Sequence, residues 1–359
     1  MNNKLRVGIL GATGAVGQRF VTLLENHPYF EVKVLAASKN SEGKKYEDLM
    51  NSRWKLNKEI PNYAKEMIVE DLNNINKIKE KVDFVFCAVN MDKQETKLLE
   101  ELYAKNEIPV VSNNSANRME KDIPMVIPEI NSEHFKIIEK QKERLNTKKG
   151  FIAVKPNCSI QSYVPLINAL MEYEPQELVV STYQAISGAG KNFNDWPEMV
   201  DNVIPFIKGE EEKSEIEPLK VWGSIENDEI VLTDKIKITS QCIRVPVTDG
   251  HLATIFVKFK NKPTKEQILE KWKNYQGEPQ KLDLPMAPKQ FITYFEEDDH
   301  PQTKLERDLD KGMAITAGRL REDNIYDYKF VGLSHNTVRG AAGGALLTAE
   351  LLYKLGYLY

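Results

Sequence analysis

The chain has 359 residues, and at about 150 residues per domain this length predicts two domains. Hydrophobic residues make up 41% and charged residues 28%, a composition that excludes a disordered chain, a collagen-like chain and a disulfide scaffold. The net charge of −4 provides no basic surplus for nucleic acid or an anionic membrane, and no apolar run is long enough for a membrane helix.

The first half of the chain alternates strand-like and helix-like patterns. Buried strands are predicted at 5–10, 30–37, 82–89 and 108–112, and helices at 16–26 and 93–106. Strand and helix alternating at this rhythm predict right-handed βαβ units and a parallel sheet.

The pattern changes after about residue 150. A helix is predicted at 161–174, and longer strands with partial alternation follow at 177–187, 236–247 and 251–260, which favours a mixed sheet. The stretch 209–220 is a charge run without a clear apolar stripe, and 337–355 ends in a helix. We therefore predict an α/β protein: a Rossmann-type parallel-sheet domain (1–156 with 336–359) and an α+β catalytic and dimerisation domain with a mixed sheet (157–335).

A glycine-rich turn lies between the first strand and the first helix. Gly11-Ala12-Thr13-Gly14-Ala15-Val16-Gly17 has the spacing G-x-x-G-x-x-G, a variant of the commoner dinucleotide-binding fingerprint. Residues without side chains permit a tight turn, and a helix N-terminus offers free N–H groups to a pyrophosphate. Gly11, Thr13, Gly14, Ala15 and Val16 are therefore candidate cofactor-binding residues; the alternative is a plain strand-to-helix turn.

The end of the second strand indicates which dinucleotide binds. No acid stands there to hold a ribose 2′-hydroxyl, as an NAD site requires. Ser38, Lys39 and Ser41, with Lys44 and Lys45, supply hydroxyls and positive charge that suit a 2′-phosphate, so we predict NADP. The alternative is that these lysines belong only to a solvated loop.

Three cysteines are far apart, with no C-x-x-C pair, so neither a disulfide frame nor a zinc site is indicated. Without a secretory signal, a reducing cytoplasm is expected. Cys158, in Lys155-Pro156-Asn157-Cys158-Ser159, lies where an extended segment meets a helix, a position that lowers a thiol pKa and offers N–H groups to an oxyanion. Cys87 and Cys242 lie inside apolar strands and are predicted to be structural; a buried core role is also the alternative for Cys158.

Arg244 and His251 stand on either side of a turn at Thr248-Asp249-Gly250, which would bring two strand ends together. His251 begins a strand at a cleft edge and is a candidate general acid or base, with a plain structural role as the alternative. His335 lies in a glycine-rich approach to the last helix. The remaining histidines have polar sequence neighbours and are predicted to be surface residues: His27, His134 and His300.

Six motifs occur together in order along the chain. They are the glycine turn, Ser112-Asn113-Asn114-Ser115-Ala116-Asn117-Arg118, Pro156-Asn157-Cys158-Ser159, Tyr183-Gln184-Ala185-Ile186-Ser187-Gly188-Ala189-Gly190, Arg244-Val245-Pro246-Val247 through His251, and Asn336-Thr337-Val338-Arg339-Gly340. With these motifs the whole chain resembles the aspartate-semialdehyde dehydrogenase family, in the branch found in archaea and fungi.

The resemblance implies a role for each matching residue. Cys158 corresponds to the nucleophile and His251 to the acid/base. Arg244 corresponds to the arginine that pairs with the substrate α-carboxylate, a planar bidentate task suited to a guanidinium. Gln184 corresponds to a residue that orients the bound acyl group.

Further residues correspond to groups around the substrate and cofactor. Arg118, Asn114 and Lys213 match groups near the substrate phosphate, and Glu210 an acid that contacts the substrate amine. The alternative for Glu210 and Lys213 is that they belong to an exposed acidic loop. Asn157 is a further candidate for the oxyanion. Ser187 and Gly188 correspond to residues that line the cofactor cleft. Asn336 corresponds to a residue near the nicotinamide carboxamide.

The reaction that the resemblance implies is NADPH-dependent reductive dephosphorylation of aspartyl phosphate through a cysteine thioester, a step in lysine, threonine, methionine and isoleucine biosynthesis. It also implies a homodimer or a dimer of dimers. Two alternatives remain: a reductase for malonyl-CoA or N-acetylglutamyl phosphate, and a non-catalytic NADP-binding regulator.

Overall fold

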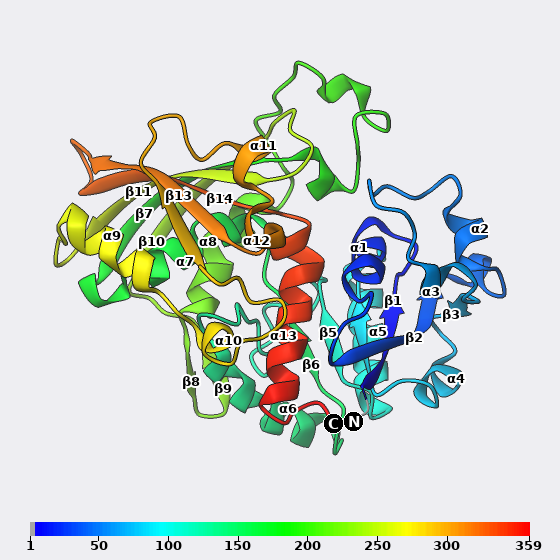
Figure 1. The fold of residues 1–359 in the computed structure, drawn as a ribbon. Coiled ribbons are helices and arrows are strands. Elements are labelled where there is room, and N and C mark those ends of the chain that lie inside the picture. The colour runs from blue at the N-terminus through cyan, green and yellow to red at the C-terminus, as the bar shows by residue number, and fades with distance from the viewer. Residues whose placement is uncertain (1–3) are drawn as a thin grey trace.

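The computed structural model describes residues 4–359 and contains two six-stranded sheets (Figure 1). The first sheet has the order β3-β2-β1-β4-β5-β6, and all its neighbouring strands are parallel. Its strands are β1 (Leu5–Leu10), β2 (Phe30–Ala37), β3 (Glu70–Asp71), β4 (Phe84–Cys87), β5 (Val110–Ser112) and β6 (Ile152–Val154). This is a doubly wound order that reverses between β1 and β4, so the predicted Rossmann-type sheet is confirmed and a crevice is expected at that reversal.

Helices connect these strands. They are α1 (Ala15–Leu23), α2 (Tyr46–Met50), α3 (Asn62–Lys65), α4 (Ile75–Lys79), α5 (Lys93–Lys105) and α6 (Ile138–Leu145). The start of α5 is capped by Asp92, whose carboxylate accepts the Gln94 N–H at 2.8 Å and satisfies one of the free donors of the first turn.

The second sheet is mixed, as predicted. Its order is β10-β7-β11-β14-β13-β12, and its strands are β7 (Pro175–Gln184), β10 (Lys237–Arg244), β11 (His251–Phe259), β12 (Ile292–Phe295), β13 (Ile315–Glu322) and β14 (Tyr328–Ser334). β7 pairs in parallel with β10 and antiparallel with β11, so it lies between two strands that follow one another in the chain. The C-terminal end of β7 therefore adjoins both the end of β10 and the start of β11.

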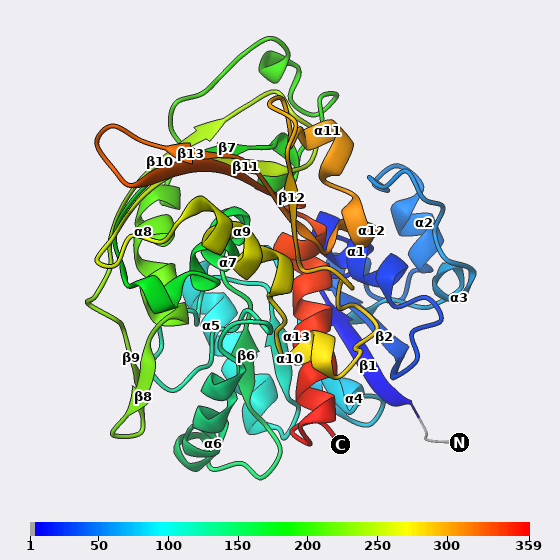
Figure 2. The same cartoon turned by 60° about the vertical axis from the view of Figure 1, so that its left-hand side comes forward.

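Helices cover one face of this sheet, and Figure 2 shows α7, α8 and α9 beneath its curved strands. These helices are α7 (Val164–Asn168), α8 (Glu210–Val221) and α9 (Lys265–Asn274). This part of the chain also contains α10 (Glu278–Lys281), α11 (Thr303–Glu306), α12 (Leu309–Gly312) and a small hairpin of β8 (Ser224–Glu226) and β9 (Glu229–Val231). Buried side chains form a continuous apolar cluster from Val85 and Val110 of the first sheet to Leu178 and Ile255 of the second. The two sheets thus share an interior and pack closely.

The last helix, α13 (Gly343–Lys354), runs along the boundary between the two units (Figure 1). Its residues 343–352 are all buried, and Leu346 and Leu351 belong to the same apolar cluster as Val7 of β1 and Phe20 of α1. The C-terminal helix therefore completes the core of the first sheet.

The structure corrects four sequence predictions, one for a helix and three for histidines. The predicted helix at 161–174 is broken: a 3-10 turn (Ser159–Ser162) precedes α7, and Tyr163 between them has a non-helical φ of −136°. His27 is buried because its Nε2 pairs with Glu350 at 2.8 Å, and His134 is buried against Asn131 and a backbone carbonyl. His300 is half-buried beside Glu306.

Candidate active site

A cavity of about 350 Å³ opens where the loops after β4, β5 and β6 meet the second unit. It lies beside the strand-order reversal, where ligands bind in doubly wound sheets. Its lining includes half of the predicted site residues, from both units: Val16, Asn114, Arg118, Asn157, Cys158, Ser187, Gly188, Glu210, Lys213 and Asn336. Motifs that are far apart in the sequence therefore meet at one cavity.

Cys158 follows β6 and caps the short 3-10 turn, with its side chain partly exposed to the cavity. Its Sγ lies 3.5 Å from His251 Nε2. Burial, followed by the negative charge of Glu210, raises the pKa of the Cys158 thiol, and the cations Lys155 and Arg118 oppose the shift. In the ligand-free site the sulfur is therefore held mainly as the thiol, and the sequence-based expectation that its position lowers the thiol pKa is wrong because burial outweighs the effect of the short turn.

His251 is fully buried, and its other ring nitrogen defines the tautomer. The Ala185 N–H donates to Nδ1 at 3.0 Å, so Nδ1 carries a lone pair and the proton of the neutral ring is on Nε2, facing sulfur. Protonating Nδ1 would place two N–H groups against each other. Burial and then the charge of Arg244 lower the pKa of His251 to about 3. The imidazole is thus a neutral Nε2–H donor.

Arg244 and Gln184 are paired in register at the ends of β10 and β7. Arg244 Nη1 donates to the Ala185 carbonyl at 2.7 Å, and the other two guanidinium nitrogen atoms make no hydrogen bond to residues 4–359. Gly188 lies directly over this group: a Cβ there would be 3.0 Å from Arg244 Nη1 and 3.2 Å from His251 Nε2. A buried guanidinium with free donors beside the Cys–His pair is suited to a carboxylate.

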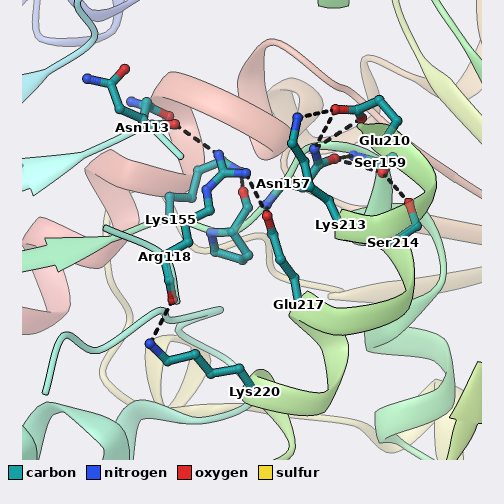
Figure 3. A network of polar contacts seen from close by, with 12 residues as sticks. Asn113, Arg118, Lys155, Asn157, Ser159, Glu210, Lys213, Ser214, Glu217 and Lys220 are labelled. Atoms are coloured by element: carbon teal, nitrogen blue, oxygen red, sulfur yellow. Dashed lines mark hydrogen bonds and ion pairs between the residues drawn. The ribbon is translucent and has the colours of Figure 1, made fainter. Parts of the chain in front are cut away.

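Helix α8 carries polar side chains on the face that it turns to the site. Figure 3 shows them along one side of the helix, beside Asn157 and Arg118. The Glu210 carboxylate accepts hydrogen bonds from Asn157 Nδ2 at 3.0 Å, Gln184 Nε2 at 3.3 Å and Lys213 Nζ at 2.7 Å. The interpretation of 209–220 as an exposed acidic loop is therefore wrong. Glu210 is buried and belongs to the site.

Four buried residues of this region were missed by sequence reasoning: Lys155, Ser214, Glu217 and Lys220. The last three, with Glu210, follow helical spacing, and this polar periodicity in the charge run was the available signal. Lys220 Nζ donates to the carbonyls of three loop residues: Arg118, Glu120 and Ile123. Burial, and then the charge of Arg118, lower the pKa of Lys155 to about 7.

Two predicted substrate-binding side chains are already hydrogen-bonded within the protein. Asn114 Nδ2 lies 3.2 Å from the fully buried Glu100, so this donor points away from a ligand in the cavity. Asn157 donates its Nδ2 to Glu210, and its Oδ1 accepts the Ser159 N–H at 2.7 Å. Both line the cavity, but their amides shape its wall, and their direct contact with substrate stays a prediction.

The glycine turn fits a dinucleotide. Gly11 has φ +85°, and a Cβ there would lie 2.5 Å from the Ala88 carbonyl; a Cβ on Gly17 would lie 2.2 Å from the Gly11 carbonyl. At Gly14, by contrast, the nearest atom to a Cβ is the Gly11 carbonyl oxygen at 3.4 Å, an ordinary van der Waals contact, so a side chain is not excluded at the start of α1. Tyr46 holds the turn by donating to the Ala12 carbonyl at 2.9 Å. An open N-terminus without a side-chain cap suits a pyrophosphate.

The other predicted cofactor residues are divided between two places. Lys39 is exposed in the turn after β2, and it makes no ion pair with residues 4–359, whereas Lys45 is paired with Glu66. Ser38 is exposed beside it, and Ser41 is buried in the same turn. Ser187 and Asn336 meet across the cavity: Asn336 Nδ2 donates to Ser187 Oγ at 2.9 Å, and its Oδ1 accepts the Gly250 N–H at 2.8 Å.

Within residues 4–359, no group of three or more His, Cys, Asp or Glu side chains is arranged to hold a metal ion. In the same part of the chain, every helix is too short or too polar to cross a membrane.

Comparisons with known proteins identify the family of this chain. The family model described as "Semialdehyde dehydrogenase, NAD binding domain" matches residues 6–138, and "Semialdehyde dehydrogenase, dimerisation domain" matches residues 164–339. Relatives named aspartate-semialdehyde dehydrogenase from Schizosaccharomyces pombe and Archaeoglobus fulgidus are 42% and 41% identical, over 98% and 97% of this chain and 99% and 98% of theirs. A crystal structure of aspartate semialdehyde dehydrogenase with NADP from Candida albicans has a TM-score of 0.88 at 37% identity, covering 99% of this chain and 100% of that one. The motif resemblance is confirmed: this chain belongs to the aspartate-semialdehyde dehydrogenase family.

Proposed function

We propose that the protein is an NADP-dependent aspartate-semialdehyde dehydrogenase, which reversibly reduces L-4-aspartyl phosphate to L-aspartate 4-semialdehyde and phosphate. The observation that carries this proposal is that the nucleophilic Cys158 lies in a site with two arginines, Arg118 and Arg244. Cys158 Sγ lies 3.5 Å from His251 Nε2, Arg118 lines the same cavity, and Arg244 lies beside His251. The substrate has an anionic phosphate at one end and a carboxylate at the other, which matches this arrangement.

The residues divide the chemistry as follows. Cys158 attacks the acyl carbon of aspartyl phosphate, its sulfur forms a thioester, and the carbon–oxygen bond to phosphate breaks. The proton of the Cys158 thiol leaves on the departing phosphate, which is released as hydrogen phosphate. Arg118 and Lys213 stabilise the departing phosphate by their charge, and Arg244 holds the α-carboxylate, which positions the reacting carbon. NADPH, when bound at the Gly11–Gly17 turn, supplies the hydride that reduces the thioester.

His251 acts at the oxygen of the acyl group. Its Nε2–H is aimed at the region of sulfur, so it can donate to the oxyanion that forms when the thioester carbon becomes tetrahedral. Collapse of that species expels the Cys158 thiolate and releases the aldehyde. A neutral imidazole that donates here needs no change of tautomer, because the Ala185 N–H already holds Nδ1 as an acceptor.

The decisive assay compares substrates. We expect phosphate-dependent reduction of NADP with aspartate semialdehyde, and little reduction with malonate semialdehyde plus CoA or with N-acetylglutamate semialdehyde plus phosphate. Cys158→Ser should abolish turnover while the unfolding midpoint stays within a few degrees of that of the wild type. Equal or better activity with either alternative set of substrates would reassign the reaction.

The preference for NADP is tested separately. Lys39→Glu places a negative charge where we propose that the 2′-phosphate binds, so KM for NADP should rise about tenfold and KM for NAD should fall or stay the same. The matched control is Lys44→Glu, whose side chain is held by the Asn40 carbonyl at 3.0 Å in the same loop. Equal effects of the two substitutions would mean that general surface charge, rather than a site at Lys39, sets the preference.

We also propose the domain boundaries 1–156 with 336–359 and 157–335, a homodimer or homotetramer, and a cytoplasmic location. The burial of α13 against the first sheet supports the first of these, and a family model described as a dimerisation domain over residues 164–339 supports the second. Light scattering of the purified protein tests the oligomeric state.

A further inference from the structure

We propose that Glu217 is a positioning residue that fixes the phosphate-binding Arg118 relative to the turn carrying Cys158. The proposal rests on the proposed function, because it takes Arg118 as a group that binds the substrate phosphate. Glu217 does not line the cavity, so it acts through its neighbours rather than by touching substrate.

The contacts of Glu217 join two separate loops. Its Oε1 accepts from Arg118 Nη1 at 2.9 Å, and its Oε2 accepts the Asn157 N–H at 2.5 Å, one residue before the nucleophile (Figure 3). Arg118 belongs to the loop after β5, and Asn157 to the turn after β6. A single carboxylate therefore determines the spacing between a phosphate-binding group and the sulfur.

Burial makes this bridge rigid. The side chains of Glu217 and Arg118 are only 4% and 9% exposed, so water does not replace either contact. Arg118 is held at two further points, because its Nη2 donates to the Asn113 carbonyl at 3.0 Å and its own carbonyl accepts from Lys220 Nζ at 2.7 Å. Its Nε is also buried and has no hydrogen-bond partner in residues 4–359, so one donor of the guanidinium is unused.

A carboxylate is required because both neighbours donate. Glutamine has the same shape, but it has only one acceptor oxygen, so its amide N–H₂ must face either Arg118 or the Asn157 N–H. Glu217→Gln therefore keeps the packing of α8 and removes one arm of the bridge. If Glu217 served only to neutralise Arg118, freeing this cation would strengthen phosphate binding; if it positions Arg118, phosphate binding weakens.

The experiment measures phosphate dependence in two ways. In the oxidation of aspartate semialdehyde with NADP, Glu217→Gln should raise KM for phosphate about 10- to 100-fold and change KM for aspartate semialdehyde less than twofold, because a displacement of about 1 Å can cost about 100-fold. Inorganic phosphate should also slow alkylation of Cys158 by iodoacetamide, and the variant should need about tenfold more phosphate for equal protection. This second measurement requires no turnover.

The matched control is Glu215→Gln, on the same helix, whose carboxylate accepts the Ser240 N–H at 2.9 Å outside the cavity. It should resemble the wild type in both measurements. If Glu217→Gln does not fold, Glu217→Asp, which is too short to reach both donors, should show the same selective loss.

Unchanged or tighter phosphate dependence in the variant, equal losses for both substrates, or no phosphate protection in the wild type would each overturn the role of Glu217. A wild-type protein that shows phosphate protection but no phosphate-dependent turnover would instead refute the proposed function, and the alkylation series would still decide about Glu217.

Discussion

Replacing His251 by glutamine tests whether the imidazole is neutral in the folded protein. The ring is fully buried, its Nδ1 accepts the Ala185 N–H, and burial with the nearby Arg244 lowers its pKa from 6.5 to about 3. Between these two pH values the unfolded chain binds a proton that the folded protein does not bind. The contribution of His251 to stability is therefore largest above pH 6.5, falls as the pH drops below it, and becomes constant below about pH 3.

The size of the effect follows from the two pKa values. At pH 8 neither state is protonated, and at pH 5 only the unfolded state is, so the free energy of unfolding loses about 2 kcal/mol between these conditions through His251 alone. His335, whose pKa burial lowers to about 4, gives a similar loss, but this histidine is present in both proteins and cancels in their difference. Glutamine does not titrate, and its Oε1 can still accept the Ala185 N–H.

Urea unfolding, followed by the fluorescence of the four tryptophans, measures this difference at pH 5, 6, 7 and 8. The wild type should be more stable than His251→Gln at pH 8, and the gap should shrink by about 2 kcal/mol at pH 5. A gap that is independent of pH, or one that widens toward acid, would mean that His251 is protonated in the folded protein, and the assignment of Nε2–H as a neutral donor would be wrong.

Three further substitutions test the geometry around the sulfur. Gly340→Ala would place a Cβ 2.7 Å from Cys158 Cβ, so we expect kcat to fall about 100-fold with little change in KM for NADP; wild-type kcat would contradict this contact. Glu210→Gln removes a charge that raises the pKa of Cys158, so alkylation by iodoacetamide at pH 8 should become faster, whereas slower alkylation would reverse the sign of that interaction. Arg244→Lys loses planar bidentate recognition, so kcat/KM for aspartate semialdehyde should fall about 100-fold while the unfolding midpoint is unchanged, and near-normal kinetics would remove the carboxylate role.

Four strands of the first sheet could be predicted because they are short apolar runs and the turn after β1 carries recognisable glycines, whereas β3 and β6, with two and three residues, were not predicted. The second sheet could be predicted only as mixed. No local pattern indicates that β7 lies between β10 and β11, although that order is what brings Arg244 and His251 to the end of the same strand. Pairing between distant strands depends on contacts that a pattern of alternation does not encode.

Prediction of the site from the sequence is limited in the same way, by contacts between residues that are distant in the chain. Cys158, Arg244 and His251 could be proposed because each has a chemistry of its own. On α8, Glu210 and Lys213 were predicted through the family resemblance, but Glu217 was not, because it looks like any other acid in a charge run until Arg118, far away in sequence, is seen beside it. His27 was misjudged for this reason too, since its partner Glu350 is 323 positions away.

The position of α13 has a consequence for how the protein is made. This helix supplies leucines to the core of the first sheet, yet it follows the entire second sheet in the chain. During synthesis, strands β1 to β6 leave the ribosome long before the helix that covers them. Their apolar surface therefore stays exposed to solvent while the other unit is translated. A nascent chain arrested before residue 343 should consequently bind chaperones and be digested by proteases throughout its N-terminal half.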